Sequence, residues 1–274
     1  MQDVTHWSPP GGLAGIFTDI DDTLTTDGAI TADALAALGD LKAAGLHLIA
    51  ITGRPVGWSA PFAAAWPVDA IVAENGAVAL LPENKDKNGL NRPRGARRQL
   101  RKTYQQDAAT RARQYARMQE VLAAIEAQVP GAHRAQDSDG RECDIAIDHG
   151  EFTHLPQNAI NACVAIMRAA GMNATVSSIH INGWYGDHDK LQGARWIVRE
   201  LLGRELDAEI ERWVYVGDST NDERMFEHFP LSVGVANIAR FLPQLQPPPC
   251  YVTQGERGAG FAELVSKILS KNRA

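Results

Sequence analysis

Acidic and polar side chains stand directly after three short apolar runs of this sequence. They are Asp19, Asp21 and Asp22 after the first run, Thr52 and Arg54 after the second, and Asp218 and Asp222 after the third. The carboxyl ends of neighbouring strands in an open parallel sheet form the crevice where ligands bind, so we expect these side chains to converge. Carboxylates this close together cannot all stay ionised without a counter-charge. A hard divalent cation with oxygen ligands supplies that charge, and Lys190, just inside a later helix, adds another.

Such a cluster is suited to phosphoryl transfer. An aspartate carboxylate can attack phosphorus and form an acyl phosphate, which divides one difficult step into two. A magnesium ion pairs with phosphate and neutralises charge on the transferring oxygens. A second carboxyl group can protonate the leaving alkoxide and then deprotonate the attacking water. A threonine hydroxyl and nearby backbone amides can hold the phosphate oxygens.

The elements that must position these residues are predicted by the hydrophobic pattern. The apolar runs are continuous, not alternating, which indicates strands that are buried on both faces; they cover residues 14–19, 46–51, 70–73 and 213–216. Thr31 can cap a helix that ends at Gly45, and Asn75-Gly76 favours a tight hairpin. We therefore expect an α/β fold, with a Rossmann-like, doubly wound parallel sheet formed by residues 1–80 and 187–274.

Residues 81–186 show a different pattern and predict an inserted unit. We expect this unit to contain helices at about 107–128 and 157–170 and strands at about 143–148, 174–177 and 179–182. We interpret it as an α+β domain with one open sheet face. Residues 92–117 are rich in arginine, which favours either a solvated surface or contact with a polyanion, and their role stays open.

Composition narrows the class of protein. The chain has 274 residues, 45% of them hydrophobic, and a formal net charge of −6, so we expect neither a nucleic-acid partner nor a membrane partner. No apolar run approaches the ~18 residues of a membrane span. The N-terminal residues lack the features of a secretory signal, and the three cysteines are predicted to be buried thiols, which favours a cytoplasmic protein. The oligomeric state cannot be predicted.

Taken together, four motifs resemble those of the haloacid dehalogenase superfamily. The matching segments are Phe17–Thr25, with the pattern Asp-x-Asp-x-Thr; Ile49–Arg54; Lys190 within His188-Asp189-Lys190; and Val214–Asp222, with the pattern Gly-Asp-x-x-Asn-Asp. Residues 232–237 are also similar to a stretch of the Cof-type branch. Asp22 departs from that branch, which usually has glycine there, and weakens assignment to a subfamily.

The resemblance implies a role for each matching residue. Asp19 would be the nucleophile and Asp21 the general acid and base. Phosphate and substrate would be bound by Thr52, Gly53, Arg54 and Lys190, and Lys190 would also steady Asp19. Mg²⁺ would be held by Asp19, Asp218 and the backbone carbonyl of Asp21, with support from Asn221 and Asp222.

The position of the insertion narrows the branch further. One helix and one strand fill the interval between Asp19 and Thr52, so no cap fits there. The insertion before Lys190 resembles the cap of Cof-type, sucrose-phosphatase-like and mannosyl-3-phosphoglycerate-phosphatase-like members, which mostly hydrolyse phosphorylated sugars or related metabolites. His180 and Asn182 alternate on one strand and are predicted to face the substrate, although an ordinary strand is nearly as well supported.

The resulting hypothesis is a magnesium-dependent phosphatase that acts on a small phosphorylated metabolite. A sugar phosphomutase would use the same aspartates but return the phosphate to the sugar. A non-catalytic protein that binds or signals through a phospho-ligand is a third, weaker hypothesis. The resemblance does not identify the substrate.

Overall fold

The continuous apolar runs form the centre of one large sheet in the computed structural model, which describes residues 1–83 and 98–270. The strand order is β1-β15-β14-β13-β2-β5-β6-β7-β8. The strand bounds are Gln2–Asp3 for β1, Gly15–Thr18 for β2, His47–Ile51 for β5, Ala70–Ala73 for β6, Val78–Glu83 for β7, Gln99–Tyr104 for β8, Trp213–Gly217 for β13, Leu231–Gly234 for β14 and Tyr251–Val252 for β15. The strands from β1 to β6 in this order are parallel, whereas β7 and β8 are antiparallel to their neighbours. The predicted α/β class is confirmed.

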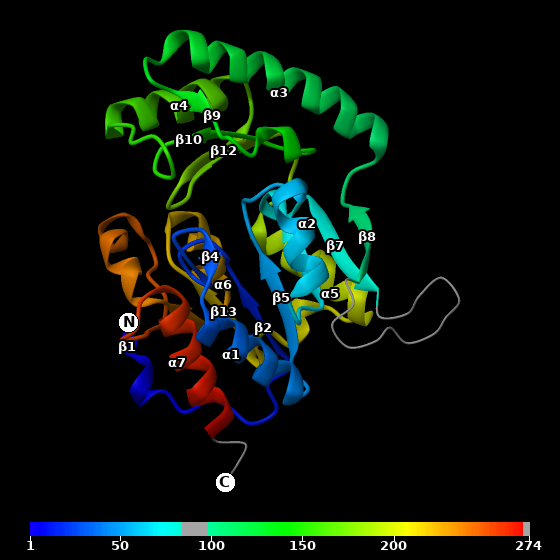
Figure 1. The fold of residues 1–274 in the computed structure, drawn as a ribbon, viewed down its shortest axis with the longest axis vertical. Coiled ribbons are helices and arrows are strands. Elements are labelled where there is room, and N and C mark those ends of the chain that lie inside the picture. Colours follow the sequence, from blue (N-terminus) through cyan, green and yellow to red (C-terminus); the bar gives the residue numbers. More distant parts are fainter. Residues whose placement is uncertain (84–97, 271–274) are drawn as a thin grey trace.

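Helices cover both faces of this sheet (Figure 1), which explains why its strands are apolar throughout. Ile16 and Leu48 belong to the hydrophobic cluster that also contains side chains of α1 (Ala32–Ala43), α2 (Val56–Ala65) and α7 (Arg257–Ser270). The next residues along the same strands, Phe17 and Ile49, belong to a second cluster with α5 (Lys190–Leu202) and α6 (Glu223–His228). Successive side chains of a strand point to opposite faces, so each strand anchors both layers.

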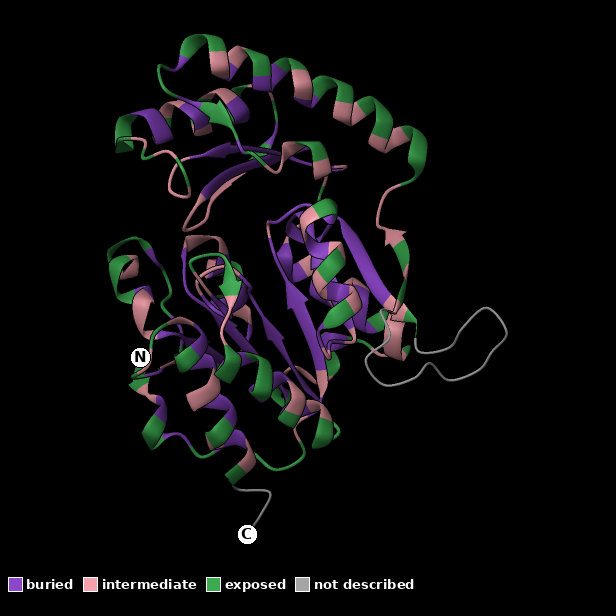
Figure 2. Ribbon diagram, viewed as in Figure 1, coloured by how far each residue is buried: buried purple, intermediate pink, exposed green. Residues whose placement is uncertain are grey.

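The inserted unit is a second, antiparallel sheet with two helices above it, at the top of Figure 1. Its strand order is β11-β12-β10-β9, and its elements are α3 (Ala108–Gln128), β9 (His133–Arg134), β10 (Ile145–Asp148), α4 (Gln157–Ala169), β11 (Asn173–Val176) and β12 (His180–Trp184). We call this unit the cap. The sheet face opposite the helices was expected to be open, but it lies on the core. Strand β12 is therefore buried along its whole length, and His180 and Asn182 with it. Buried segments of the core and the cap face each other in Figure 2.

The large sheet continues beyond residue 81, where the inserted domain was predicted to begin. Strand β7 forms a hairpin with β6 through the turn Glu74–Gly76, and β8 then pairs with the outer edge of β7 from Val78↔Tyr104 to Glu83↔Gln99. The chain therefore returns to the core sheet before it enters α3. We propose that the cap proper begins after β8 and ends before α5.

Part of the arginine-rich segment lies outside the described residues, including Arg92, Arg94 and Arg97. Of the described part, Arg98 donates to the carbonyl groups of Ala63 at 3.1 Å and Val68 at 3.3 Å. Arg98 thus binds the carboxyl end of α2 and the loop behind it. Among the helices that the structure describes, none is both long and apolar enough to cross a membrane.

Candidate active site

Asp19 lies where strand β2 ends, beside the end of β13. The register pairs Thr18 with Val216, and the amide of Asp19 donates to the carbonyl of Val216 at 2.8 Å. This pairing brings the ends of β2 and β13, and with them Asp19 and Asp218, to one edge of the sheet. The structure thus confirms the convergence that the apolar runs predicted.

Lys190 joins two of the carboxylates at this edge. Its Nζ atom lies 2.7 Å from Oδ1 of Asp19 and 2.6 Å from Oδ1 of Asp222. Lys190 begins α5, which is capped by the side chain of Asp189 accepting from the amide of Gln192 at 2.7 Å. Burial alone would lower the pKa of Lys190, but the two carboxylates outweigh burial and hold this pKa above its usual value. Lys190 is therefore a fixed cation in the site.

The nucleophile candidate is itself deeply buried. Only 4% of Asp19 is exposed, and burial, helped by the charges of Asp222 and Asp21 and opposed by Lys190, raises its pKa to about 7. A bound divalent cation would oppose this shift, because it favours the charged carboxylate.

Asp222 was predicted to support the metal site, and both of its carboxylate oxygens already have protein partners. Its Oδ1 atom accepts from Lys190 and from the hydroxyl of Tyr215. Its Oδ2 atom accepts from the backbone amides of Asp218 at 3.0 Å and Ser219 at 3.2 Å. Both oxygens are occupied, so Asp222 is better suited to orienting Lys190 and the loop after β13 than to coordinating a metal ion directly.

Asp218 has the features of a metal ligand. Carboxylate oxygens of Asp19, Asp218 and Asp222 all lie within 4.8 Å of one another. The Oδ1 atom of Asp218 is buried and has no hydrogen-bond partner among the described residues, while Asn237 donates to its Oδ2 atom at 3.2 Å. Burial, Asp19 and Asp222 raise the pKa of Asp218 well above its usual range. A buried, unpaired carboxylate oxygen beside two further carboxylates fits a hard divalent cation.

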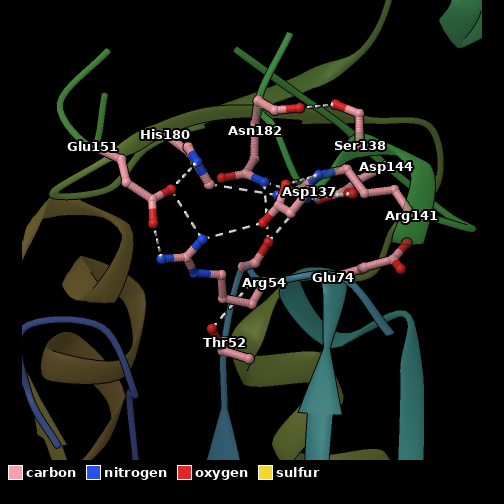
Figure 3. Close-up of polar contacts among 12 residues, drawn as sticks. Thr52, Arg54, Glu74, Asp137, Ser138, Arg141, Asp144, Glu151, His180 and Asn182 are labelled. Atoms are coloured by element: carbon pink, nitrogen blue, oxygen red, sulfur yellow. Dashed lines mark hydrogen bonds and ion pairs between the residues drawn. The ribbon is translucent and has the colours of Figure 1, made fainter. Parts of the chain in front are cut away.

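Asp21 binds Arg54, and Arg54 in turn connects the core to the cap. Arg54 donates to Asp21 at 2.9 and 3.0 Å. In the cap it donates to Glu151 at 2.7 and 3.0 Å and to Asp137 at 3.2 Å (Figure 3). Its guanidinium group also lies 4.7 Å from the ring centroid of Trp58. Because Glu151 and Asp137 belong to the cap, one buried arginine holds both units at the site.

A second polar network joins the two units next to the first, as Figure 3 shows. In the cap, Asp144 accepts from Arg141 at 2.8 Å and from Asn182 at 2.9 Å. Both donors also reach the core, where they bind the carbonyl of Gly53 at 3.0 and 3.2 Å respectively. From the core side, the buried carboxylate of Glu74 accepts the backbone amide of Glu142 at 3.0 Å.

Cap and core enclose a cavity of only about 10 Å³ between them. It is lined by Asp19, Asp21, Thr52, Gly53, Arg54, residues 177–179, His180, Asn182 and Asn221. That volume holds roughly one water molecule. A phosphate ester is larger, so this part of the site is closed in the structure.

Eight of the eleven predicted site residues line this cavity, and the exceptions are Lys190, Asp218 and Asp222. Many of the polar groups of the lining residues bind protein partners. The hydroxyl of Thr52 accepts the amide of Arg54 at 3.0 Å. His180 lies 3.1 Å from Glu151, and Asn221 accepts from the hydroxyl of Ser219 at 3.0 Å. The substrate-binding roles of Thr52, Gly53, Arg54, His180 and Asn182, and the metal-supporting role of Asn221, stay predictions.

Sequence reasoning missed the residues that bind Arg54 and the cap. Asp137 and Glu151 lie 83 and 97 positions from Arg54, in segments without a motif. Glu74 lies in the predicted turn, and no pattern in the neighbouring sequence indicated that its carboxylate accepts backbone amides of the cap. Tyr215 and Asn237 stood inside the matching segments, so their polarity beside the acidic motif could have identified them.

Comparisons with known proteins agree with this geometry. Residues 16–126 match the family model of haloacid dehalogenase-like hydrolases. A crystal structure from Thermoplasma acidophilum is 15% identical, covering 94% of this chain and 98% of that chain with a TM-score of 0.67. The sucrose-phosphatase of Synechocystis sp. PCC6803, solved with sucrose and phosphate, is 14% identical; the match covers 92% of this chain and 96% of that chain, with a TM-score of 0.61. A trehalose-6-phosphate phosphatase related protein is 16% identical; the match covers 94% of this chain and 99% of that chain, with a TM-score of 0.58. At these identities the likeness concerns the fold, and no curated protein matches the sequence.

Proposed function

We propose that this chain, of which residues 16–126 match the model of haloacid dehalogenase-like hydrolases, is a magnesium-dependent phosphatase for a small phosphorylated metabolite, and that its substrate is a phosphorylated sugar. The observation that carries this proposal is the clamp of Lys190 on Asp19, at 2.7 Å, beside the unpaired oxygen of Asp218. A nucleophile held by a cation, next to a site for a second cation, suits attack on a phosphate ester. The structural neighbours that are named as sugar phosphatases support the substrate class.

In the proposed reaction Asp19 attacks phosphorus and forms a phosphoaspartate. Lys190 holds one oxygen of Asp19 in place and offers its charge to the phosphoryl group. A magnesium ion, held by Asp19, Asp218 and the backbone carbonyl of Asp21, would supply neutralisation of the charge on the phosphoryl oxygens. Asp222 keeps Lys190 and the loop after β13 in position.

Asp21 is the proposed general acid and base. Both of its oxygens bind Arg54 in the closed structure, so a substrate must draw Arg54 away before Asp21 can reach the leaving oxygen. Arg54 then becomes free to bind the incoming phosphate. This exchange of partners would couple substrate binding to the release and closure of the cap, because Arg54 also holds Glu151.

The first experiment is a phosphate-release assay with a panel of phosphorylated metabolites, with magnesium and with an excess of chelator. Asp19→Asn should abolish both turnover and phosphoenzyme formation. Asp21→Asn should slow turnover by about 10²–10⁴-fold, and most strongly for poor leaving groups, which need protonation. Asp40→Asn, an exposed aspartate of α1, is the matched control and should leave activity unchanged. Full activity of Asp19→Asn, or of wild-type protein in chelator, would contradict the proposal. Phosphate that appears on a second hydroxyl of the sugar instead of in solution would identify a phosphomutase.

A further inference from the structure

A second cavity opens next to Asp21, on the side where the leaving group of a phosphate ester would lie. It has a volume of about 340 Å³ and lies between the core and the cap. Its lining includes Asp21, Arg54, Glu151, Phe152, Arg240 and Arg257. Small-molecule sites usually have volumes of about 300–1,000 Å³, so this cavity suits a compact organic group. It offers a place for the part of the substrate that the phosphate-binding residues do not contact.

The charges of this lining are already paired with one another. Arg240 lies 2.9 Å from Asp22, and Arg257 lies 3.2 Å from Asp22 and 3.4 Å from Asp27. Arg54 is bound by Asp21 and Glu151. Each guanidinium group of the described lining lies within ion-pair distance of a carboxylate, although Nε of Arg257 makes no hydrogen bond. Four carboxylates face three guanidinium groups in this lining, so the cavity disfavours a second anionic group of a substrate. Hydroxyl groups could instead bridge the paired charges, because each can donate to a carboxylate and accept from an arginine.

An aromatic ring stands at the edge of this polar cavity. Phe152 is 62% exposed, and it is one of the few large hydrophobic side chains with such exposure among the described residues. Because Phe152 lines the cavity, a ligand bound there would cover part of its exposed ring. A phenyl ring offers a flat face that can pack against the C–H face of a sugar ring.

The loop that carries Phe152 is held in shape by a single buried carboxylate. Asp148, at the end of β10, accepts four successive amides: Gly150 at 3.2 Å and Glu151, Phe152 and Thr153 at 3.0 Å each. Asp148 is only 3% exposed. These bonds present Glu151 to Arg54 and Phe152 to the cavity from one rigid loop.

We propose that Phe152 determines specificity by packing against the ring of a neutral sugar in this cavity, and that Asp148 is the positioning residue of its loop. The proposal rests on the proposed phosphatase function and adds the substrate class: a phosphorylated neutral sugar without a second anionic group.

The test compares kcat and KM for neutral sugar phosphates, for their acidic counterparts and for acetyl phosphate, whose leaving group has no ring. Glucose 6-phosphate and 6-phosphogluconate form a matched pair, and other neutral hexose phosphates extend the panel. Phe152→Ala should lower kcat/KM for the neutral sugar phosphates about 3- to 10-fold, mainly through KM, and leave acetyl phosphate within about 2-fold. Leu35→Ala, which removes another exposed hydrophobic side chain on α1, is the control and should change neither.

Asp148→Asn should raise KM for the same sugar phosphates more than KM for acetyl phosphate, because the amide group that replaces one carboxylate oxygen cannot accept two of the four amide bonds of this loop. Circular dichroism and thermal melting verify that the variant folds, and Phe152→Ala tests the proposal independently if it does not. The inference is overturned if Phe152→Ala affects acetyl phosphate and sugar phosphates equally, if it affects neither, or if the acidic sugar phosphates are preferred. Wild-type protein that hydrolyses neither acetyl phosphate nor any sugar phosphate would instead overturn the proposed function itself.

Discussion

The ion pair between Arg54 and Glu151 fastens the cap to the core, and the chain contains a natural reference for its strength. Arg54 donates to the two oxygens of Glu151 at 2.7 and 3.0 Å. Arg134 donates to the two oxygens of Glu126 at the same two distances. The side chains of the first pair are 4% and 21% exposed, whereas those of the second are 49% and 26% exposed. The pairs share these distances, but the first is less accessible to water and its arginine also binds Asp21 and Asp137.

This difference sets the expected coupling energies. Hydrogen bonds to charged groups contribute about 1.5–3 kcal/mol when they are shielded from water. Exposed ion pairs contribute about 0.2–1 kcal/mol, since water and salt screen them. We therefore expect a coupling of about 2 kcal/mol or more between Arg54 and Glu151, and of less than about 1 kcal/mol between Arg134 and Glu126. The first value corresponds to roughly a 30-fold change in an equilibrium constant.

Two double-mutant cycles measure these energies, one with Arg54→Gln and Glu151→Gln and one with Arg134→Gln and Glu126→Gln. The free energy of unfolding of each variant is obtained from urea titrations at pH 7. Each cycle subtracts the effects of the two single substitutions from that of the double substitution, which leaves the coupling energy of the pair. Repeating both cycles at ~1 M salt should reduce the exposed coupling more than the buried one. Equal coupling energies in the two cycles would refute the conclusion that burial makes the contact between cap and core strong.

Three further predictions concern the metal site, a buried histidine and a glycine turn. Magnesium should raise the melting temperature of the wild-type protein and should raise that of Asp218→Asn much less, because Asp218 supplies an unpaired oxygen; equal shifts would exclude Asp218 as a ligand. Burial lowers the pKa of His188 from 6.5 to about 4. The unfolded chain therefore binds a proton more readily than the folded protein, and the free energy of unfolding should fall by at most about 3 kcal/mol as the pH falls from 6.5 toward 4. His188→Phe should remove that part of the pH dependence of the free energy of unfolding, measured in urea titrations. If the free energy of unfolding changes with pH as steeply in the variant as in the wild type, His188 is not responsible. Gly76 has a φ of +106°, and an added Cβ would lie 2.2 Å from the carbonyl oxygen of Asp189, so Gly76→Ala should lower the free energy of unfolding by at least about 2 kcal/mol. Gly12→Ala, where φ is +75° and nothing lies within 4 Å of the added Cβ, should cost only about 1 kcal/mol, and an equal loss at both positions would show that the contact with Asp189 has no effect.

The core could be predicted from the sequence because its strands are buried on both faces. Short continuous apolar runs such as Leu46–Ile51, which alternate with segments of helical periodicity, indicate strands of a buried parallel sheet. The polar residues that follow these strands were therefore expected to meet at one edge of the sheet. Strand β8 escaped prediction because it lies at the outer edge of the sheet, where most of its residues are exposed or half-buried and no apolar run marks it.

The site itself was predictable only as far as its motifs extend. The clamp of Lys190 on Asp19 lies between residues that belong to two motifs, so it was expected. The binding of Arg54 by Asp137 and Glu151 depends on how the cap lies on the core, and no local pattern encodes that contact between distant segments. The hydrogen bonds of Asp222 to two backbone amides and to Tyr215 were not predicted either, because the motif does not specify the partners of this carboxylate.

The three cysteines of this chain lie in three different environments, and thiol labelling could therefore follow its motions without any engineered probe. The prediction that all three thiols are buried is wrong for Cys250, which is exposed and should react with a thiol reagent at all times. Cys143 lies where the cap meets Glu74, and burial with the neighbouring carboxylates raises the pKa of its thiol, so it should react only when the cap lifts. Cys163 is enclosed in the hydrophobic cluster of the cap and should react only on unfolding. A ligand that keeps the cap closed would then slow the labelling of Cys143 and leave the rate at Cys250 unchanged.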